Sequence, residues 1–239
     1  SQALAVLRYE LETFVCDGQY EKGMAHILET YLKNIDQAQQ PGVWVSGFFG
    51  SGKSHLVKML RALWVDTTFT DGATARGIAN LPQGIVEYLK ELNTQAKRHG
   101  GLHAASGTLG SGASGSVRLA LLRIIFKSAG LPELYSLARF VLWLRQDGIY
   151  EQVRAHVEQN GYDWDVELDN FYVAEGLHAA LMAVKPKVFA SPEACVETLN
   201  NLYPYVQDVS SDDMLKAIRQ ALIKDGKFPL TLIVLDEVQ

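Results

Sequence analysis

Eight consecutive residues, GFFGSGKS at positions 47–54, have the composition of a phosphate-binding loop. They fit the Walker A pattern G-x-x-x-x-G-K-[ST], in which glycines let backbone N–H groups point inward at phosphate oxygens. The lysine of such a loop reaches the β- and γ-phosphates, and the hydroxyl that follows it ligates Mg²⁺. We therefore expect ATP and Mg²⁺ as cofactors, bound by Gly47, Phe48, Phe49, Gly50, Ser51, Gly52, Lys53, Ser54 and His55.

A distant acidic pair has the chemistry to complete this site. The apolar run at 232–235 precedes Asp236 and Glu237, and its length and branched side chains predict a strand buried on both faces, as in a parallel sheet. Asp236 would hold Mg²⁺ beside Ser54, and Glu237 would polarise the water that attacks the γ-phosphate. Lys53 and Glu237 are thus the candidate catalytic residues, and a solvated strand end is the alternative for the pair.

The elements that must position these residues follow from apolar periodicity. Helices are predicted at 24–35, from Lys53 onward and at 82–99, with short strands at 43–47 and 102–109. The long segment after the Gly/Ser-rich stretch is predicted to be mainly helical, and Ser191 with Pro192 fits the start of one of its helices.

These expectations define an α/β fold, a P-loop NTPase with a parallel-sheet core and a large helical insertion between Walker A and Walker B. The expected regions are a helical lead-in at 1–40, the P-loop core at 41–116, a helical block at 117–228 and the Walker B strand at 229–239. Because the chain stops just after the acidic pair, we expect a truncated sheet and the amino-terminal part of a larger ATPase.

Composition narrows the function classes. A formal net charge of -5 provides no strong overall attraction for nucleic acid, although a local basic face is compatible with it. Cys16 and Cys195 lack metal-site spacing, so free thiols in a cytoplasmic protein are expected and zinc is disfavoured. No apolar stretch approaches the roughly 20 residues of a membrane span, so no membrane association is expected.

Several blocks together resemble a known family: FVCDGQYEKGMAHIL, GVWVSGFFGSGKSHLVKML, SGTLGSGASGSVRLALLRIIFKSAGLPE, ARFVLWLRQDGI and FPLTLIVLDEVQ. The chain resembles the large ATPases of bacterial phage-exclusion systems, the BREX and phage growth limitation group of PglY/BrxC type. The resemblance implies an AAA+-like domain whose nucleotide cycle drives conformational change or complex assembly in phage defence. It also implies other phage-defence proteins as partners, including a DNA methyltransferase, and is compatible with a homo-oligomer; DNA contact is not evident in this chain.

Other interpretations stay open at this point. GSGASG at 110–115 fits the dinucleotide pattern G-x-G-x-x-G but lacks the following acidic strand, which favours a loop or helix-capping turn. The acids of YDWDVELDN lack the glycine of a calcium loop and favour a helix start. His26, His156 and His178 are isolated, His55 is expected to pack beside the site, and Cys16 and Tyr20 are candidates for an adenine pocket by analogy. A P-loop phosphotransferase and a nucleotide-gated scaffold without turnover are the alternative functions.

Overall fold

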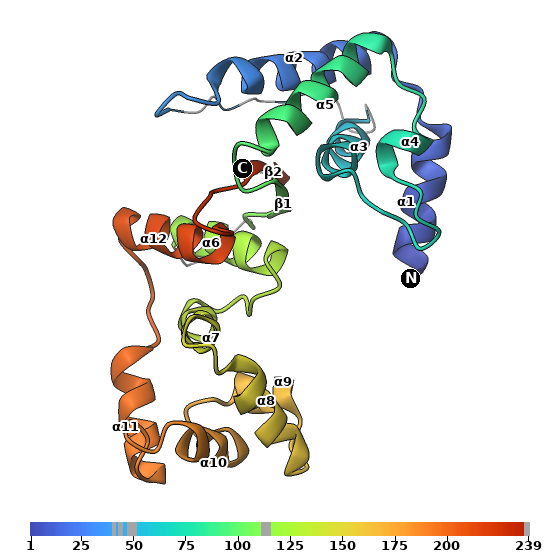
Figure 1. Cartoon of the computed structure of the whole chain (residues 1–239). Coiled ribbons are helices and arrows are strands. Elements are labelled where there is room, and N and C mark those ends of the chain that lie inside the picture. Colours follow the sequence, from blue (N-terminus) through green and yellow to red (C-terminus); the bar gives the residue numbers. More distant parts are fainter. Residues whose placement is uncertain (40–41, 43–44, 47–51, 111–115, 237–239) are drawn as a thin grey trace. The chain divides into compact units, whose positions relative to one another are not determined.

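The computed structural model describes residues 1–39, 42, 45–46, 52–110 and 116–236 (Figure 1). The chain divides into two compact units. The first comprises residues 1–106 and 223–236, and the second is formed by residues 107–222 among those described. Each unit has its own apolar core.

The described part of the first unit holds five helices and a short sheet. These are α1 (Gln2–Thr13), α2 (Gly18–Asn34), α3 (Lys53–Val65), α4 (Ala75–Ile78) and α5 (Gln83–Ala96), with strands β1 (Leu102–Thr108), which crosses the unit boundary, and β2 (Leu230–Asp236). Helix α2 packs against α5 and α3, and α3 packs against β2. Their shared core includes the fully buried side chains of Met24, Leu28, Leu63 and Trp64. The helices predicted at 24–35, from Lys53 and at 82–99 are confirmed.

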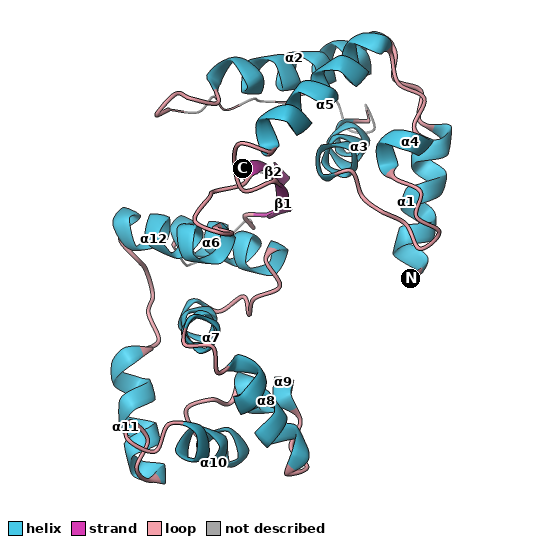
Figure 2. Ribbon diagram, in the orientation of Figure 1, coloured by secondary structure: helices cyan, strands magenta, loops and turns pink. Residues whose placement is uncertain are grey.

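The predicted parallel-sheet core is wrong for the described residues. They are mostly helical, and β1 and β2 form a parallel sheet of two strands (Figure 2). Of the strand predicted at 43–47, Val45 and Ser46 are described and form no strand. The other three residues lie outside the described residues. The segment 230–236 is a strand as predicted, but it is not buried on both faces, because Ile233 and Leu235 keep 42% and 37% of their surfaces exposed. An apolar run predicts a strand without fixing how many strands and helices will flank it.

The second unit is built from helices, as predicted for this segment. They are α6 (Val117–Ser128), α7 (Tyr135–Gln146), α8 (Tyr150–Gln159), α9 (Trp164–Asp169), α10 (Glu175–Val184), α11 (Pro192–Leu202) and α12 (Ser211–Leu222). Helix α12 packs against α6 and α7, while α10 packs against α8, α9 and α11. Polar side chains cap several of these helices, since Ser116, Asp163 and Ser191 each accept a hydrogen bond from a first-turn backbone N–H.

Candidate functional site

The start of α3 carries the described part of the Walker A motif. Gly52 is the N-cap residue with a left-handed backbone (φ 85°), and Lys53 and Ser54 are the first two residues of the helix. No described side chain caps this end of α3. The first N–H groups of a helix have no intrahelical acceptor and carry a partial positive charge, so this end of α3 has the geometry that binds an anion.

Tyr20 of α2 lies directly over Gly52. Its hydroxyl donates a long hydrogen bond of 3.5 Å to the Gly52 carbonyl oxygen. A Cβ atom at Gly52 would overlap the Tyr20 hydroxyl, so no other residue fits at this position without movement. The glycine is therefore required twice, by its left-handed backbone and by the side chain packed on it.

His55 packs into an aromatic cluster beside the motif. Its ring meets the rings of Phe14 and Tyr20 edge-on, with centroids 5.6 and 6.2 Å away, and Phe14 and Tyr20 are themselves 5.8 Å apart. Cys16 is buried in the same core, where loss of hydration, with a smaller contribution from Glu21, raises the pKa of its thiol. The cluster fixes the first turn of α3 against the end of α1 and the start of α2.

The opposite end of α3 is attached to the beginning of β2. Trp64 Nε1 donates a hydrogen bond of 3.1 Å to the Leu230 carbonyl oxygen, and Tyr31 packs edge-on against the Trp64 ring at 4.7 Å. From this attachment, about 16 Å of helix leads back to Lys53 at 1.5 Å per residue. About 20 Å of strand leads forward to Asp236 at 3.3 Å per residue. Lys53 and Asp236 therefore lie at the far ends of two elements that share this attachment.

The candidate residues divide into those the structure describes and those it does not. Gly52, Lys53, Ser54 and His55 occupy the N-cap and first turn of α3, and Asp236 ends β2. Outside the described residues lie Gly47, Phe48, Phe49, Gly50, Ser51 and Glu237. The aromatic cluster was not predicted as a unit, because Phe14, Tyr20 and His55 come from separate segments and only their fold brings them together.

The acidic segment at 163–169 forms a helix start, as predicted. Asp163 accepts a hydrogen bond of 3.0 Å from Val166 N, and the buried Glu167 accepts one of 2.8 Å from Leu177 N. His178 is buried as well, with its Nε2 2.8 Å from the Phe171 carbonyl oxygen. Glu167 and His178 thus connect the α9 region with α10, and no group of three or more residues suited to a metal ion occurs within the described ranges.

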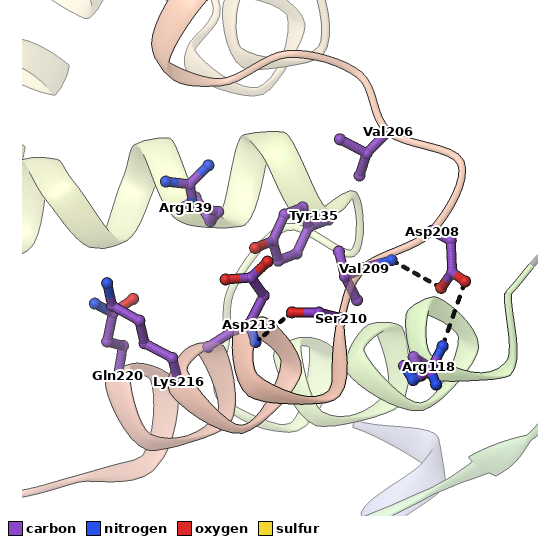
Figure 3. A pocket seen from close by; sticks show the side chains of 11 residues that line it. Arg118, Tyr135, Arg139, Val206, Asp208, Val209, Ser210, Asp213, Lys216 and Gln220 are labelled. Carbon is purple, nitrogen blue, oxygen red and sulfur yellow. Dashed lines mark hydrogen bonds and ion pairs between the residues drawn. The ribbon is translucent and has the colours of Figure 1, made fainter.

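The second unit contains a cavity of about 590 Å³ between α7, α12 and the segment before α12 (Figure 3). Its lining includes three cationic side chains, Arg118, Arg139 and Lys216, and two carboxylates, Asp208 and Asp213. The volume is within the range of about 300 to 1,000 Å³ typical of small-molecule sites. The sequence gives no signal of this cavity, because its lining comes from segments about 90 residues apart along the chain.

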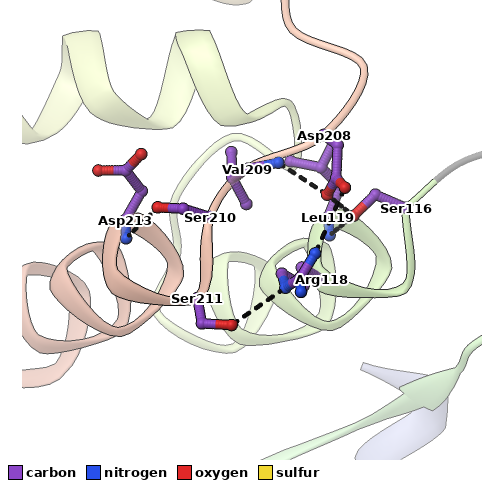
Figure 4. Close-up of polar contacts among 8 residues, drawn as sticks. All are labelled: Ser116, Arg118, Leu119, Asp208, Val209, Ser210, Ser211 and Asp213. Atoms are coloured by element: carbon purple, nitrogen blue, oxygen red, sulfur yellow. Dashed lines mark hydrogen bonds and ion pairs between the residues drawn. The ribbon is translucent and has the colours of Figure 1, made fainter.

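Some polar groups of this cavity already bond to neighbouring residues. Ser116 donates a short hydrogen bond to Asp208, which also pairs with Arg118 at 3.3 Å (Figure 4). The Ser116 hydrogen bond, followed by one from Val209 N, lowers the pKa of Asp208. Arg139 lies over the Tyr135 and Tyr203 rings at 5.6 and 5.5 Å. The lining mixes three cations with two carboxylates, of which Arg118 and Asp208 form an ion pair, and this mixture selects no particular class of ligand.

The two cysteines are free, as expected, and both are buried, with Cys195 packed in the core of the second unit. Among the residues that the structure describes, no helix combines the length and apolarity needed to cross a bilayer. No family model and no solved structure matches the chain. Function is therefore inferred from the chain's own residues and contacts.

Proposed function

We propose that the chain is an ATP-binding and ATP-hydrolysing module in which residues 47–54 hold the phosphates. The main support is that Gly52, Lys53 and Ser54 begin α3, while the other end of that helix is bonded to the strand that leads to Asp236. A turn that merely joined two elements would not need a lysine followed by a hydroxyl at the start of a helix.

The described residues fit a nucleoside triphosphate with Mg²⁺. The N-cap residue of α3 is a left-handed glycine, Gly52, which has no Cβ to obstruct phosphate oxygens, and the helix start has the partial positive charge to accept them. In this proposal Lys53 would bind the terminal phosphates, and Ser54 and Asp236 would hold the metal. Bound Mg²⁺ would neutralise the charge that develops on the phosphates.

Hydrolysis needs a group that orients the attacking water, and we assign this role to Glu237. A carboxylate that directly follows the metal-binding aspartate is suited to water activation. The family-like blocks quoted above support a role in bacterial phage defence of the BREX or phage growth limitation type. The nucleotide cycle would then drive conformational change or assembly with other defence proteins, a DNA methyltransferase among them. The two buried free thiols support a cytoplasmic location.

Calorimetric titration with Mg-ATP tests nucleotide binding. We expect the wild-type chain to bind and Lys53→Ala to lose at least tenfold in affinity, a difference of about 1.4 kcal/mol. Lys58→Ala is the matched control, because Lys58 lies on the same helix and pairs with Glu10 instead. Equal affinity in the two variants, with unchanged circular dichroism, would contradict the assignment of Lys53.

Phosphate release tests hydrolysis separately. We expect Glu237→Gln to keep Mg-ATP affinity while losing turnover, since it removes only the carboxylate that orients water. Binding without turnover in the wild-type chain and its partners would replace the ATPase proposal with a nucleotide-gated scaffold. A phosphorylated small-molecule product would instead identify a phosphotransferase.

A further inference from the structure

Five cationic side chains gather at the edge of the first unit where β1 and β2 begin. We call this surface the basic edge and define it as Arg61 on α3, Lys97 and Arg98 just after α5, and Lys224 and Lys227 in the turn before β2. All five are exposed. They come from three segments that are widely separated in the sequence, so no local run of charge predicts the surface.

Backbone contacts hold two of these segments together. Gly100 N donates to the Phe228 carbonyl oxygen at 2.9 Å, and Leu230 N donates to the Gly101 carbonyl oxygen at 2.8 Å. A side chain at Gly100 would collide with the backbone of Lys227, which shows how closely the segments approach. The residues that end α5 are thereby fixed beside the turn that precedes β2.

The turn itself is closed by reciprocal backbone hydrogen bonds. Lys224 N donates to the Lys227 carbonyl oxygen at 3.0 Å, and Lys227 N donates to the Lys224 carbonyl oxygen at 2.9 Å. The third segment contributes Arg61, whose charge acts on the same histidine as the charge of Lys224. That histidine is His103 of β1, whose pKa is lowered by burial and then by the charges of Lys224 and Arg61.

The positive charge of the basic edge is not neutralised within the described part of the first unit. None of its five side chains forms an ion pair with a described residue, whereas Arg8, Lys33 and Lys58 in the same unit all do. The segments that carry the basic edge contribute one acid, Asp225. This concentration of cations occurs in a chain whose formal net charge is -5. Unpaired like charges repel one another, so the fold alone does not account for their gathering.

We propose that the basic edge binds the phosphate backbone of duplex DNA. The five cations come from helix α3, the turn after α5 and the turn before β2, so they are spread over three segments and suit an extended row of phosphates better than one small anion. Duplex DNA presents one negative charge per roughly 1.7 Å of helix axis. Lysine and arginine contacts to such a backbone position a protein without selecting a base sequence.

DNA at this surface would be compatible with the proposed nucleotide site. Strand β2 begins beside the basic edge and ends at Asp236, about 20 Å further along the strand. The DNA proposal does not depend on ATP binding, because the two surfaces share no residue. Loss of one activity by mutation is therefore expected to leave the other intact.

The competing occupant is an anionic membrane surface. Ile223 and Phe228 flank the turn and keep 42% and 38% of their surfaces exposed. Two apolar side chains provide much less area than the broad apolar face of an interfacial helix, which is why we favour DNA.

Fluorescence anisotropy with a short labelled duplex tests the proposal on the whole chain. We expect salt-sensitive binding by the wild type and a loss of about tenfold or more in each of two variants, Lys97→Gln with Arg98→Gln and Lys224→Gln with Lys227→Gln. Each variant removes two phosphate contacts, so the slope of log affinity against log salt should flatten by about 1.8. The matched control, Lys127→Gln with Lys187→Gln, makes the same charge change at exposed lysines of the second unit and should bind like the wild type.

Several outcomes would overturn the proposal. These are no duplex binding by the wild type at low salt, equal affinities in the edge and control variants, and tighter binding to phosphatidylserine vesicles or single-stranded DNA than to the duplex. Circular dichroism and thermal unfolding of each variant verify that the fold is retained, so reduced binding by a folded edge variant supports the proposal. Unaltered Mg-ATP affinity in the edge variants would separate this surface from the nucleotide site.

Discussion

The indole Nε1 of Trp64 donates a hydrogen bond of 3.1 Å to the carbonyl oxygen of Leu230, 166 positions further along the chain. Trp64 is fully buried, and its ring also packs against Tyr31 of α2. One side chain thus connects α2, the Walker A helix α3 and the strand that leads to Asp236. This contact is long-range and buried, so we expect it to stabilise the first unit. It also fixes α3, which carries Lys53 and Ser54, against β2, which carries Asp236.

Replacing Trp64 by phenylalanine should destabilise the first unit by about 2 kcal/mol. The change leaves a buried carbonyl oxygen with one donor fewer and removes part of a packed ring. Chemical denaturation followed by circular dichroism measures this loss. Trp143→Phe is the control, because the half-buried Trp143 makes no indole hydrogen bond to a described residue. Equal losses in the two variants would show that the bond to Leu230 contributes little.

Gly52→Ala should destabilise the start of α3 and weaken Mg-ATP binding. A left-handed backbone costs a residue with a Cβ atom roughly 1 to 2 kcal/mol, and the new methyl group would overlap the Tyr20 hydroxyl. Thermal unfolding measures the first effect and calorimetry the second.

Two further variants separate the causes at Gly52. Adding Tyr20→Phe to Gly52→Ala removes the hydroxyl and should restore part of the stability, whereas the backbone strain remains. Gly23→Ala, at an ordinary helical position of α2 with its nearest neighbour 3.4 Å from the added Cβ, should be neutral or stabilising. A destabilised Gly23→Ala together with a normal Gly52→Ala would contradict this account.

His103 should make stability depend on pH. Burial, followed by the charges of Lys224 and Arg61, lowers its folded-state pKa below the ordinary histidine value. The unfolded chain therefore takes up the proton first as pH falls, and protonation favours unfolding. This contribution is present above the unfolded-state pKa and is lost as pH falls toward the folded-state value.

Denaturant unfolding across the mildly acidic range measures the effect of His103. The free energy of unfolding should fall less steeply with decreasing pH in His103→Gln than in the wild type. Lys224→Gln should raise the pKa of His103, as followed by NMR of its ring protons. An unchanged pKa in that variant would place Lys224 too far from His103 to act on it.

The parts of this fold that the sequence predicts are those governed by neighbouring residues. Ser191 with Pro192 begins α11, the acids near Asp163 begin α9, and the apolar run before Asp236 forms β2. Each depends on capping or periodicity within a few residues. The extent of the sheet depends on which segments pair, and local periodicity does not contain that information.

The surroundings of the candidate site were less predictable for the same reason. The Walker A pattern identifies Lys53 and Ser54 directly, but the packing of Tyr20 on Gly52 joins residues 32 positions apart. The basic edge likewise combines Arg61 with the segments at 97–98 and 224–227. The composition did not predict a basic surface, because the net charge of -5 is a sum over the whole chain and does not report where the cations lie.

Arg76 should be among the most important single side chains of the first unit. Its guanidinium donates to the carbonyl oxygens of Leu63 at 2.7 Å, Trp64 at 2.9 Å and Leu89 at 3.2 Å, so it satisfies the end of α3 and attaches it to α5. Arg76→Met keeps a similar length but leaves these carbonyls without their donor, at a cost of about 3 kcal/mol. Denaturant unfolding measures the loss against Arg123→Met, an exposed arginine whose replacement should change stability by less than about 0.5 kcal/mol. If the two variants unfold alike, water must replace the guanidinium at the end of α3, and the attachment between α3 and α5 must come from their apolar contacts instead.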